Sequence, residues 1–496
     1  MSKIGIAPPE PARPIAIIGM SCRLPGANSI VEFWELLLRE ENQVCDVPAE
    51  RFDVGTWHHP QPRTPGRMSS RRGSFIDDIA GFDADYFDIS AHEAVRMHPQ
   101  QRVLLETAHD AIEDAGIPLD QLAGTSTGVY VASLSTSEYW DLLREAGMLD
   151  LHAFLGTGPI GTLAGRLAHA LDLRGPNLAV DATCASGLLA VHLACQSLRT
   201  GDAEFALAAG VSLVLTPDIS IALSQSGVLS PAGISRFGDA TSDGYGRGEG
   251  VAAVLLKPLD RALTDGDPVR AVILGSAMTS NGRAKAHMAA PCGDGQSEAL
   301  RRAYLAAGIA PGDVDYVEAH GTGTVAGDRV ELSALAQVLR QGRRPGQPCV
   351  VGSVKSNVGH TEPTAGLVGL LKTALSLQHG WIPRTLHVDT PNPVLDTAGS
   401  VLRLARTAQA WPRRAHHPGL AGVSCLGATG SNTHAVLSTP PEPRIGDNRC
   451  TGPLTLPLSA RKPEALTELA RRYLRFLEAE QHTGRLRDVC YTAGAH

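Results

Sequence analysis

Two stretches of the chain share one organisation, and this repetition is the strongest constraint on the fold. In each, an apolar run that predicts a strand ends in a polar turn, and a helix that is apolar nearly all round follows. The first turn holds Cys184 and its helix ends near Gly201; the second follows Val350–Lys355, holds His360, and its helix ends near Gly380. The helix ends lie 179 residues apart. We expect a duplicated fold with both turns at one site; the alternative is a coincidence of two buried helices.

Cys184 stands at the junction between the first predicted strand and its helix. The free NH groups and the positive end of a helix stabilise a thiolate, and at such sites the pKa of a thiol falls from about 8.5 to between about 3.5 and 7.5. The same NH groups can bind an oxyanion. The position therefore predicts a nucleophile with a lowered pKa. The alternative is a small buried cysteine that packs the strand–helix junction.

Other polar turns also follow predicted strands. One delivers His320 into a turn of glycines and threonines, where Thr322 and Thr324 offer hydroxyls to a polar ligand. In the second duplicated turn, His360 follows Lys355, which is informative because the chain has only six lysines. A single histidine at the end of a strand is more often structural. One cysteine, two histidines and a lysine at such junctions together indicate a catalytic site.

Composition excludes several classes of protein. The net charge of -7, with no long basic block, argues against a nucleic-acid partner. No run approaches the roughly 18 apolar residues that a membrane span needs, and prolines interrupt the N-terminus where a signal peptide would lie. The nine cysteines are scattered and odd in number. This pattern favours a reduced, cytoplasmic enzyme over a disulfide-bonded secreted protein.

Four short motifs and the three turns around Cys184, His320 and His360 occur in a characteristic order. The motifs are Pro14–Gly26, Met97–Arg102, Gly165–Arg166 and Gly244–Glu249. Collinear as they are, they resemble the ketosynthase domain of a modular type I polyketide synthase, in the thiolase-like family of condensing enzymes. The resemblance covers nearly the whole chain. It implies an α/β fold, a layered αβαβα sandwich of two duplicated halves, and a homodimer across a buried edge.

The resemblance also divides the chain into segments. We expect a flexible tail at residues 1–12 and a ketosynthase at 13–440, with halves of roughly 13–265 and 266–440. Residues 441–496 are similar to the start of an α/β linker domain that joins a ketosynthase to an acyltransferase. Within it, Pro463 opens an amphipathic helix. The chain stops soon after this helix, so we expect a fragment of a longer polypeptide.

The resemblance implies a role for each residue of the central turns. Cys184 accepts an acyl chain from the phosphopantetheine thioester of an acyl carrier protein. His320 and His360 promote decarboxylation of a malonyl- or methylmalonyl-type extender and donate hydrogen bonds to the enolate oxygen, for which neutral histidines are suited. The enolate then condenses with the Cys184 thioester to give a β-ketoacyl product. Lys355 supports the histidines, with Glu331 as its expected charge partner.

The remaining site residues follow from the same resemblance. Thr322 and Thr324 would hold the pantetheine arm, the NH groups of Cys184 and Ala428 would bind the oxyanion, and Asn432 would support the loop. No metal and no bound cofactor are implied, because the substrates arrive on the carrier protein. The implied partners are a second copy of the chain, acyl carrier protein, and the acyltransferase and other domains of the same synthase.

The sequence departs from the family pattern at several positions. Ala182–Thr183 and Ala185–Gly187 replace the usual Thr-Ala and Ser-Ser-Ser around the nucleophile, which are small changes. Val325–Arg329 replaces a proline-bearing loop. Ala428 stands where the family carries a bulky residue that gates the nucleophile, in a loop that begins with Leu426 instead of phenylalanine. These changes predict a roomier pocket, with an unusual acyl substrate or an atypical condensation.

A dinucleotide-binding enzyme is the first of three rival functions. Gly156–Gly161, with Asp181 further on, satisfies the bare glycine pattern. No convincing strand leads into it, however, and Pro159 interrupts the turn, so we interpret it as a chance match.

The other two rivals belong to the same family. A thiolase would use free coenzyme A and a second cysteine as acid and base, where this chain offers His360. A non-elongating ketosynthase would act as an acyl gate or scaffold: it would keep Cys184 but fail to decarboxylate. The two histidines argue against this last alternative, while Ala428 leaves room for it.

Overall fold

The computed structural model describes residues 11–134, 137–157, 159–284, 287–395, 401–412, 417–442, 452–478 and 485–495. Residues 1–10 of the expected N-terminal tail lie outside this part of the chain. So do residues 443–451 and 479–484 of the expected linker. Within the described residues, no helix is long and apolar enough to cross a membrane.

The main strands form two sets of five that repeat one topology. The first set has the order β1-β7-β6-β4-β5 and the second the order β8-β15-β14-β9-β10, extended by β12. In both, the first three strands pair antiparallel and the last three pair parallel. The bounds of the first set are Ile15–Arg23 (β1), Gly250–Pro258 (β7), Phe205–Ser212 (β6), Thr127–Ala132 (β4) and Asn177–Val180 (β5). Those of the second are Ala271–Ser280 (β8), Ser431–Ser438 (β15), Leu420–Leu426 (β14), Tyr316–Glu318 (β9), Cys349–Gly352 (β10) and Leu402–Leu404 (β12).

The two sets join side by side where β1 pairs antiparallel with β8 over three residue pairs. Identical strand order and identical directions in both halves confirm the predicted duplication. Short elements connect these strands or extend the fold. They are α1 (Ile30–Leu38), β2 (Cys45–Asp46), α2 (Val54–Trp57), β3 (Arg72–Gly73), α3 (Ala91–Ala94), α5 (Leu119–Leu122), α6 (Glu138–Glu145), α7 (Leu151–Thr157), α10 (Asp218–Ser226), α11 (Leu259–Asp265), the 3-10 turns Pro311–Asp313 and Glu362–Thr364, α14 (Lys355–Val358), β11 (Trp381–Ile382) and β13 (Gln409–Ala410).

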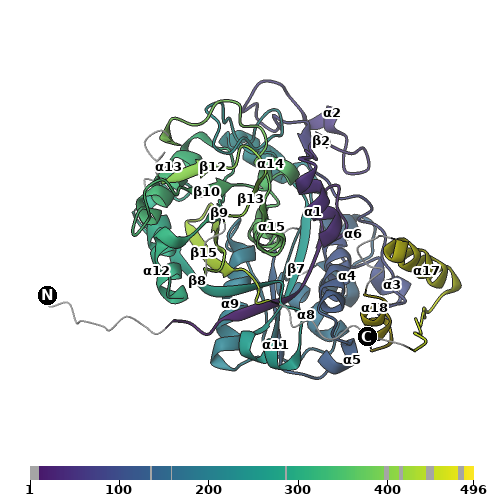
Figure 1. Ribbon diagram of the computed structural model, residues 1–496. Coiled ribbons are helices and arrows are strands. Elements are labelled where there is room, and N and C mark those ends of the chain that lie inside the picture. Colours follow the sequence, from purple (N-terminus) through teal and green to yellow (C-terminus); the bar gives the residue numbers. More distant parts are fainter. Residues whose placement is uncertain are drawn as a thin grey trace.

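Six longer helices complete a sandwich of five layers, αβαβα (Figure 1). Helices α4 (Pro99–Asp114) and α8 (Gly161–Ala170) cover the outer face of the first half, and α12 (Gly293–Ala307) and α13 (Val325–Leu339) cover that of the second. Helices α9 (Ser186–Thr200) and α15 (Ala365–His379) lie between the halves, inside the largest apolar cluster. Burying an apolar face on both sides explains why these two helices are apolar nearly all round.

Helices α9 and α15 approach each other closely because each carries a glycine at the contact. A Cβ at Gly187 would lie 2.8 Å from the carbonyl oxygen of Pro363, and one at Gly366 would lie 2.6 Å from the nitrogen of Leu188. These glycines are again 179 residues apart, like the left-handed glycines that end the two helices. The internal repeat therefore extends to the contact between its own copies.

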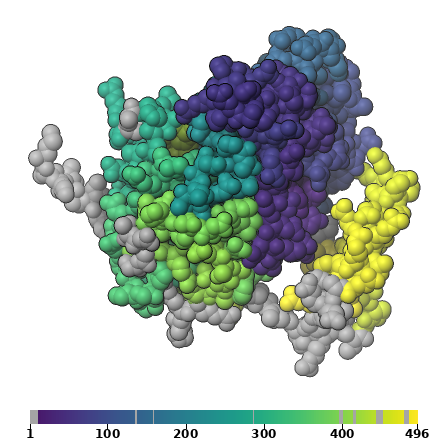
Figure 2. All heavy atoms as spheres, turned by 90° about the horizontal axis from the view of Figure 1, so that it is seen from above, coloured from purple at the N-terminus to yellow at the C-terminus, as the bar shows by residue number. Residues whose placement is uncertain are grey.

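The C-terminal segment lies against the outside of the first half, where Figure 2 shows it in yellow beside the purple and blue N-terminal residues. It contains α17 (Pro463–Glu478) and α18 (Leu486–Ala495), and α17 begins at the expected Pro463. Lys462 lies 3.0 Å from Asp85 and Arg461 lies 3.4 Å from Asp88. These ion pairs are exposed, so each stabilises the contact only slightly.

We predict that Gly366→Ala lowers the thermal unfolding midpoint. The new Cβ would collide with the backbone of α9, and overpacking of this kind typically costs about 1–3 kcal/mol. Gly165→Ala in α8 is the matched control, since no atom lies within 4 Å of its Cβ position and alanine favours a helix over glycine by up to about 1 kcal/mol. Equal midpoints for both variants, measured by differential scanning fluorimetry, would contradict the tight helix contact.

Candidate active site

The nucleophile turn is held by its own side chains between β5 and α9. Thr183 adopts a left-handed conformation with φ of 54°, which is uncommon for a residue other than glycine. A carboxylate oxygen of Asp181 accepts the NH of Thr183 at 2.9 Å. The Ser186 hydroxyl accepts the NH of Ala182 at 2.8 Å and donates to the Thr183 carbonyl at 2.6 Å. These bonds present Cys184 directly before the first residues of α9.

The second duplicated turn meets the first, as the repeat predicts. His360 Nε2 lies 3.2 Å from the Cys184 sulfur. The other ring nitrogen, Nδ1, accepts the backbone NH of Glu362 at 3.2 Å. A neutral imidazole carries one proton, and an acceptor at Nδ1 places that proton on Nε2. His360 thus points a donor at the cysteine sulfur.

His320 completes the cluster from β9, the strand that precedes its turn. Its ring centre lies 5.4 Å from that of His360, edge to face. Burial, and then the nearby charge of Lys355, hold the pKa of both histidines well below the usual 6.5. Both rings are therefore neutral at physiological pH and can donate hydrogen bonds. The two histidines and the lysine, which lies buried in α14, come together around Cys184.

The predicted lowering of the Cys184 pKa is wrong for this state of the protein. Cys184 is partly exposed as a residue, yet burial of its sulfur raises the pKa of the thiol above its ordinary value. The neighbouring Cys425 and the negative charge of Glu362 also raise this pKa, while Lys355 lowers it. Loss of water around the sulfur thus outweighs the favourable helix end. The thiol is protonated at rest and must be ionised when a substrate arrives.

No ion pair within 4.0 Å joins the described side chains of Lys355 and Glu331, the expected charge partners, although the charge of Lys355 does lower the pKa of Glu331. The carboxylate of Glu331 instead accepts the backbone NH of His320 at 2.7 Å and that of Gly321 at 2.8 Å. Burial raises the pKa of Glu331, and these two NH groups and the charge of Lys355 oppose the shift. Glu331 therefore positions the His320 backbone. Lys355 acts on the histidines through its positive charge, without a close ion pair to Glu331.

The turn after His320 places Thr322 and Thr324 side by side, with their hydroxyl oxygens 3.1 Å apart. Thr322 is buried and Thr324 is half-buried. Asp328, whose role the sequence alone did not predict, holds this turn. It accepts the NH of Gly323 at 3.0 Å and that of Gly238 at 2.9 Å. Burial raises the pKa of Asp328 to about 7. The only sequence feature that pointed to Asp328 was its place within Val325–Arg329, the stretch that departs from the family pattern.

The loop after β14 packs against the nucleophile turn. A Cβ at Gly427 would lie 2.4 Å from the carbonyl oxygen of Ala182, so only glycine fits there. Ala428 follows and is exposed, beside a half-buried Leu426. Asn432 on β15 donates to the side chain of Asn281 at 2.7 Å and so ties the end of the loop to the residue that follows β8.

A second cysteine, Cys425, contacts the nucleophile turn, and its role was not predicted from the sequence. The thiol of Cys425 on β14 donates to the carbonyl oxygen of Cys184 at 2.8 Å and lies 3.8 Å from Nδ1 of His320. Burial raises its pKa to about 11, so it remains a thiol. Cys425 therefore joins the nucleophile turn to the strand that carries the exposed loop.

The two described glycines of the bare dinucleotide pattern lie on helices. Gly156 belongs to α7 and Gly161 opens α8, while Gly158 lies outside the described residues. A dinucleotide-binding turn needs a strand directly before its first glycine, and here a helix takes that place. The pattern is a chance match, as expected.

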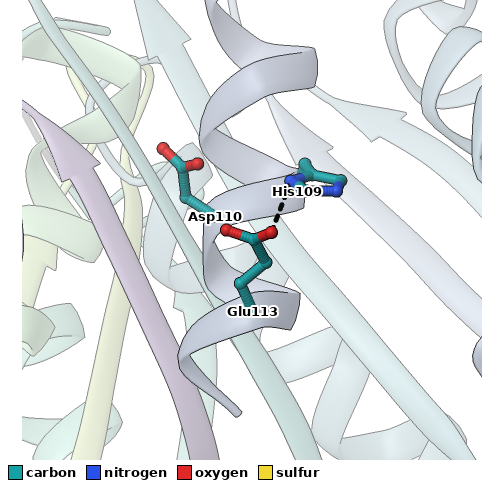
Figure 3. Close-up of side chains that lie close together, drawn as sticks. All are labelled: His109, Asp110 and Glu113. Atoms are coloured by element: carbon teal, nitrogen blue, oxygen red, sulfur yellow. Dashed lines mark ion pairs between the residues drawn. The ribbon is translucent and has the colours of Figure 1, made fainter. Parts of the chain in front are cut away.

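Three potential metal ligands lie on one stretch of α4, away from the site: His109, Asp110 and Glu113, with ligand atoms within 4.8 Å of one another (Figure 3). Glu113 reaches toward His109 Nδ1 at 3.9 Å, and Nε2 of His109 is engaged by the Tyr86 hydroxyl at 2.7 Å. Both imidazole nitrogens thus have protein neighbours, and we assign this cluster no part in the reaction.

Comparison with known proteins agrees with this geometry. Family models match in sequence order: the beta-ketoacyl synthase N-terminal domain at residues 12–262, its C-terminal domain at 270–389, and the ketoacyl-synthetase C-terminal extension at 391–494. The chain belongs to the β-ketoacyl synthase family. Two solved ketosynthases share its fold. One is the oxazolomycin ketosynthase domain OzmH KS7 of Streptomyces albus JA3453, at 34% identity and a TM-score of 0.89, covering 97% of this chain and 83% of that one. The other comes from module 6 of the bacillaene synthase of Bacillus subtilis 168, at 33% and 0.87, covering 97% and 80%.

Sequence relatives of this ketosynthase are polyketide synthases. It is 42% identical over 487 residues to a phenolphthiocerol/phthiocerol polyketide synthase protein of Mycobacterium bovis, a match covering 97% of this chain and 26% of the relative. It is 41% identical over 489 residues to a different protein of the same synthase in Mycobacterium tuberculosis, covering 98% and 31%. The chain thus spans about a quarter to a third of these curated relatives. The comparisons confirm the predicted family and the thiolase-like fold class.

We predict that Asp328 makes stability depend on pH. Its folded pKa of about 7 lies above the ordinary value of 3.8, so the folded state binds a proton more tightly than the unfolded state. Stability from this group is therefore complete below about pH 4 and is lost as pH rises toward 7, by on the order of 2 kcal/mol between pH 5 and 8. Asp328→Asn removes the titration, so the melting temperature of the wild type should fall relative to the variant across that range. A constant difference would contradict the raised pKa.

Proposed function

We propose that this ketosynthase extends a polyketide chain, by acylation of Cys184 followed by decarboxylative Claisen condensation on the same sulfur. The observation that carries the proposal is the neutral His360, whose Nε2 lies 3.2 Å from the Cys184 sulfur, beside a second neutral histidine, His320. A nucleophilic cysteine beside two uncharged histidine donors suits a reaction in which negative charge develops on an oxygen atom in two separate steps.

In the first half-reaction, the Cys184 thiolate attacks the carbonyl carbon of an acyl thioester borne on the phosphopantetheine of an acyl carrier protein. The tetrahedral intermediate expels the pantetheine sulfur, which takes up the proton that Cys184 released and leaves as a thiol, and the acyl group stays on Cys184. One thioester replaces another, so the site needs chiefly to position the carbonyl and ionise the nucleophile. The raised pKa of the thiol makes ionisation the costly step. A hydrogen bond from His360 and the charge of Lys355 favour the thiolate.

In the second half-reaction, a malonyl- or methylmalonyl-carrier protein loses carbon dioxide. The electron pair of the broken carbon–carbon bond forms an enolate, whose oxygen accepts hydrogen bonds from His320 and His360. The enolate carbon attacks the Cys184 thioester, and the new oxyanion lies against the backbone NH groups of Cys184 and Ala428. Collapse expels the Cys184 thiolate and leaves a β-ketoacyl thioester on the carrier. Neutral imidazoles suit the enolate because they donate without trapping it by proton transfer.

The pantetheine arm would enter past Thr322 and Thr324, whose hydroxyls face one another over the turn held by Asp328. The residues need no resident metal and no bound cofactor for these steps, since both substrates bring their thioester with them. We therefore assign acyl carrier protein as the substrate-bearing partner. The acyltransferase and other domains of the same synthase are the further proposed partners, and the cytoplasm is the proposed location.

A second copy of the chain is the other proposed partner. Strand β5 is the edge strand of the first set and has no further neighbour among the described strands. Its apolar side chain Leu178 is 50% exposed. More large apolar side chains are exposed nearby in sequence on α6 and α7: Leu142, Leu151, Phe154 and Leu155. An exposed apolar edge strand favours pairing with another strand, and two β5 strands could pair across a two-fold axis.

Intact-protein mass spectrometry tests the proposed function. We predict that the wild type gains the acyl mass when offered a panel of acyl thioesters, whereas Cys184→Ala gains none. A malonyl- or methylmalonyl-carrier protein added to the acylated wild type should then give an elongated β-ketoacyl carrier and return the enzyme to its free mass. Acylation without decarboxylation or elongation would overturn chain extension and identify an acyl gate.

The exposed Ala428 leads to a second prediction. A bulky side chain here would narrow the space beside Cys184, so Ala428→Ile should slow acylation by branched or long acyl thioesters about tenfold relative to acetyl, which corresponds to roughly 1.4 kcal/mol in the transition state. Competition within the same acyl panel measures this ratio directly. Thr429→Val, a neighbouring exposed substitution, is the control. Unchanged acyl preference in Ala428→Ile would contradict a roomier pocket.

A further inference from the structure

His360 is held in place by the segment that precedes β7. Its backbone NH donates to the carbonyl of Gly246 at 2.7 Å, and its own carbonyl accepts the NH of Gly248 at 2.8 Å. The ring of Tyr245 stands edge-on to the His360 ring at 4.9 Å. These contacts fix the backbone and the ring plane of His360. None of them determines which ring nitrogen carries the proton.

The backbone NH of Glu362 makes that choice, because it donates to His360 Nδ1. Glu362 itself adopts a left-handed conformation, with φ of 47°, at the start of the 3-10 turn Glu362–Thr364. Residues with a Cβ rarely adopt this conformation, and it persists where other contacts hold it. The NH that leaves the proton on Nε2, facing the Cys184 sulfur, thus belongs to a residue with a strained backbone.

One buried ion pair supplies the holding contact. The Arg247 guanidinium donates to both carboxylate oxygens of Glu362, at 2.6 and 2.9 Å, and the two side chains are only 7% and 5% exposed. A third donor of Arg247 reaches the Ser220 hydroxyl at 2.7 Å, which fixes the guanidinium in turn. A planar fork of this kind fixes both the position and the orientation of the carboxylate.

We propose that the Arg247–Glu362 pair is a positioning device for His360. It holds the left-handed backbone of Glu362, aims its NH at Nδ1, and so keeps the imidazole proton on Nε2 toward Cys184. Neither residue touches the reacting sulfur in this arrangement, and both act through His360. The role rests on the function proposed above, because a fixed Nε2 donor matters when Cys184 is the nucleophile.

Glycine and alanine at position 362 separate this role from simple charge loss. Both Glu362→Ala and Glu362→Gly remove the carboxylate and leave Arg247 without its partner. Only glycine adopts the left-handed conformation without strain, so only Glu362→Gly keeps the NH at Nδ1 in the absence of the ion pair. The readout is the rate at which iodoacetamide alkylates Cys184 at about pH 8, followed on its own peptide by mass spectrometry. This probe needs no acyl carrier and no condensation, so failure of the proposed function leaves the measurement interpretable.

Iodoacetamide should alkylate Cys184 about tenfold more slowly in Glu362→Ala than in the wild type, which is the change in rate that a rise of one unit in the thiol pKa produces. In Glu362→Gly the alkylation rate should stay within about threefold of the wild-type rate. Equal rates in the two variants would overturn the proposal. So would acceleration in both, which simple removal of a negative charge beside the thiol predicts. The same comparison in an Arg247→Met background removes the unpaired guanidinium if either single variant fails to fold.

A second buried pair provides the matched control. Arg51 and Glu249 also form a two-point ion pair, at 3.2 and 3.0 Å, with side chains 5% and 0% exposed. Glu249 holds the NH groups of Ile76 and Val214 and makes no contact with the histidines. Arg51→Met should lower the melting temperature as much as Arg247→Met does, without slowing alkylation of Cys184 in the folded protein. If alkylation of Cys184 slowed equally in Arg51→Met and Arg247→Met, the Arg247–Glu362 pair would only stabilise the fold, and the positioning role would be overturned.

Discussion

The close packing of α9 against α15 is the constraint on which the site depends. Gly187 and Gly366 allow the two helix backbones to come into direct contact, and each helix follows one of the duplicated turns. Bringing the helix starts together also brings together the residues just before them, Cys184 and His360. The reaction centre is thus a product of the internal repeat: one copy supplies the nucleophile, the other supplies its donor, and neither half contains the site alone.

Burial gives this centre opposing electrostatic effects. The same exclusion of water that keeps His320 and His360 neutral raises the pKa of the Cys184 thiol. Neutral histidines suit an enolate, but a protonated thiol is a poor nucleophile. The structure offsets this cost locally, through the donor on His360 and the positive end of α9. A dry site with a protonated resting thiol also has a chemical advantage, because an unoccupied thiolate would react with adventitious electrophiles.

Periodic features of the fold could be predicted from the sequence, whereas contacts with backbone NH and carbonyl groups could not. Apolar runs of matching length predicted α9, α15 and the duplication, and the strand–turn–helix order predicted that Cys184 and His360 meet. The contacts of Asp328 with Gly238 and of Cys425 with Cys184 could not be predicted, because these partners are main-chain atoms of distant segments. The Cys184 pKa was misjudged for a related reason, since a helix start is visible in sequence whereas the depth of burial is set by the second half of the fold.

The described side chains of Lys355 and Glu331 form no close ion pair, and this affects how the site uses charge. A lysine paired closely with a carboxylate would present little net field to its surroundings. Here Glu331 is engaged by two backbone NH groups, and Glu318, the next buried carboxylate, pairs with Lys372 at 2.8 Å instead. The positive charge of Lys355 therefore also reaches the two histidines and Cys184, where it lowers all three pKa values. One cation thus favours both states that the reaction needs, the neutral imidazole and the thiolate, because losing a proton is the common step.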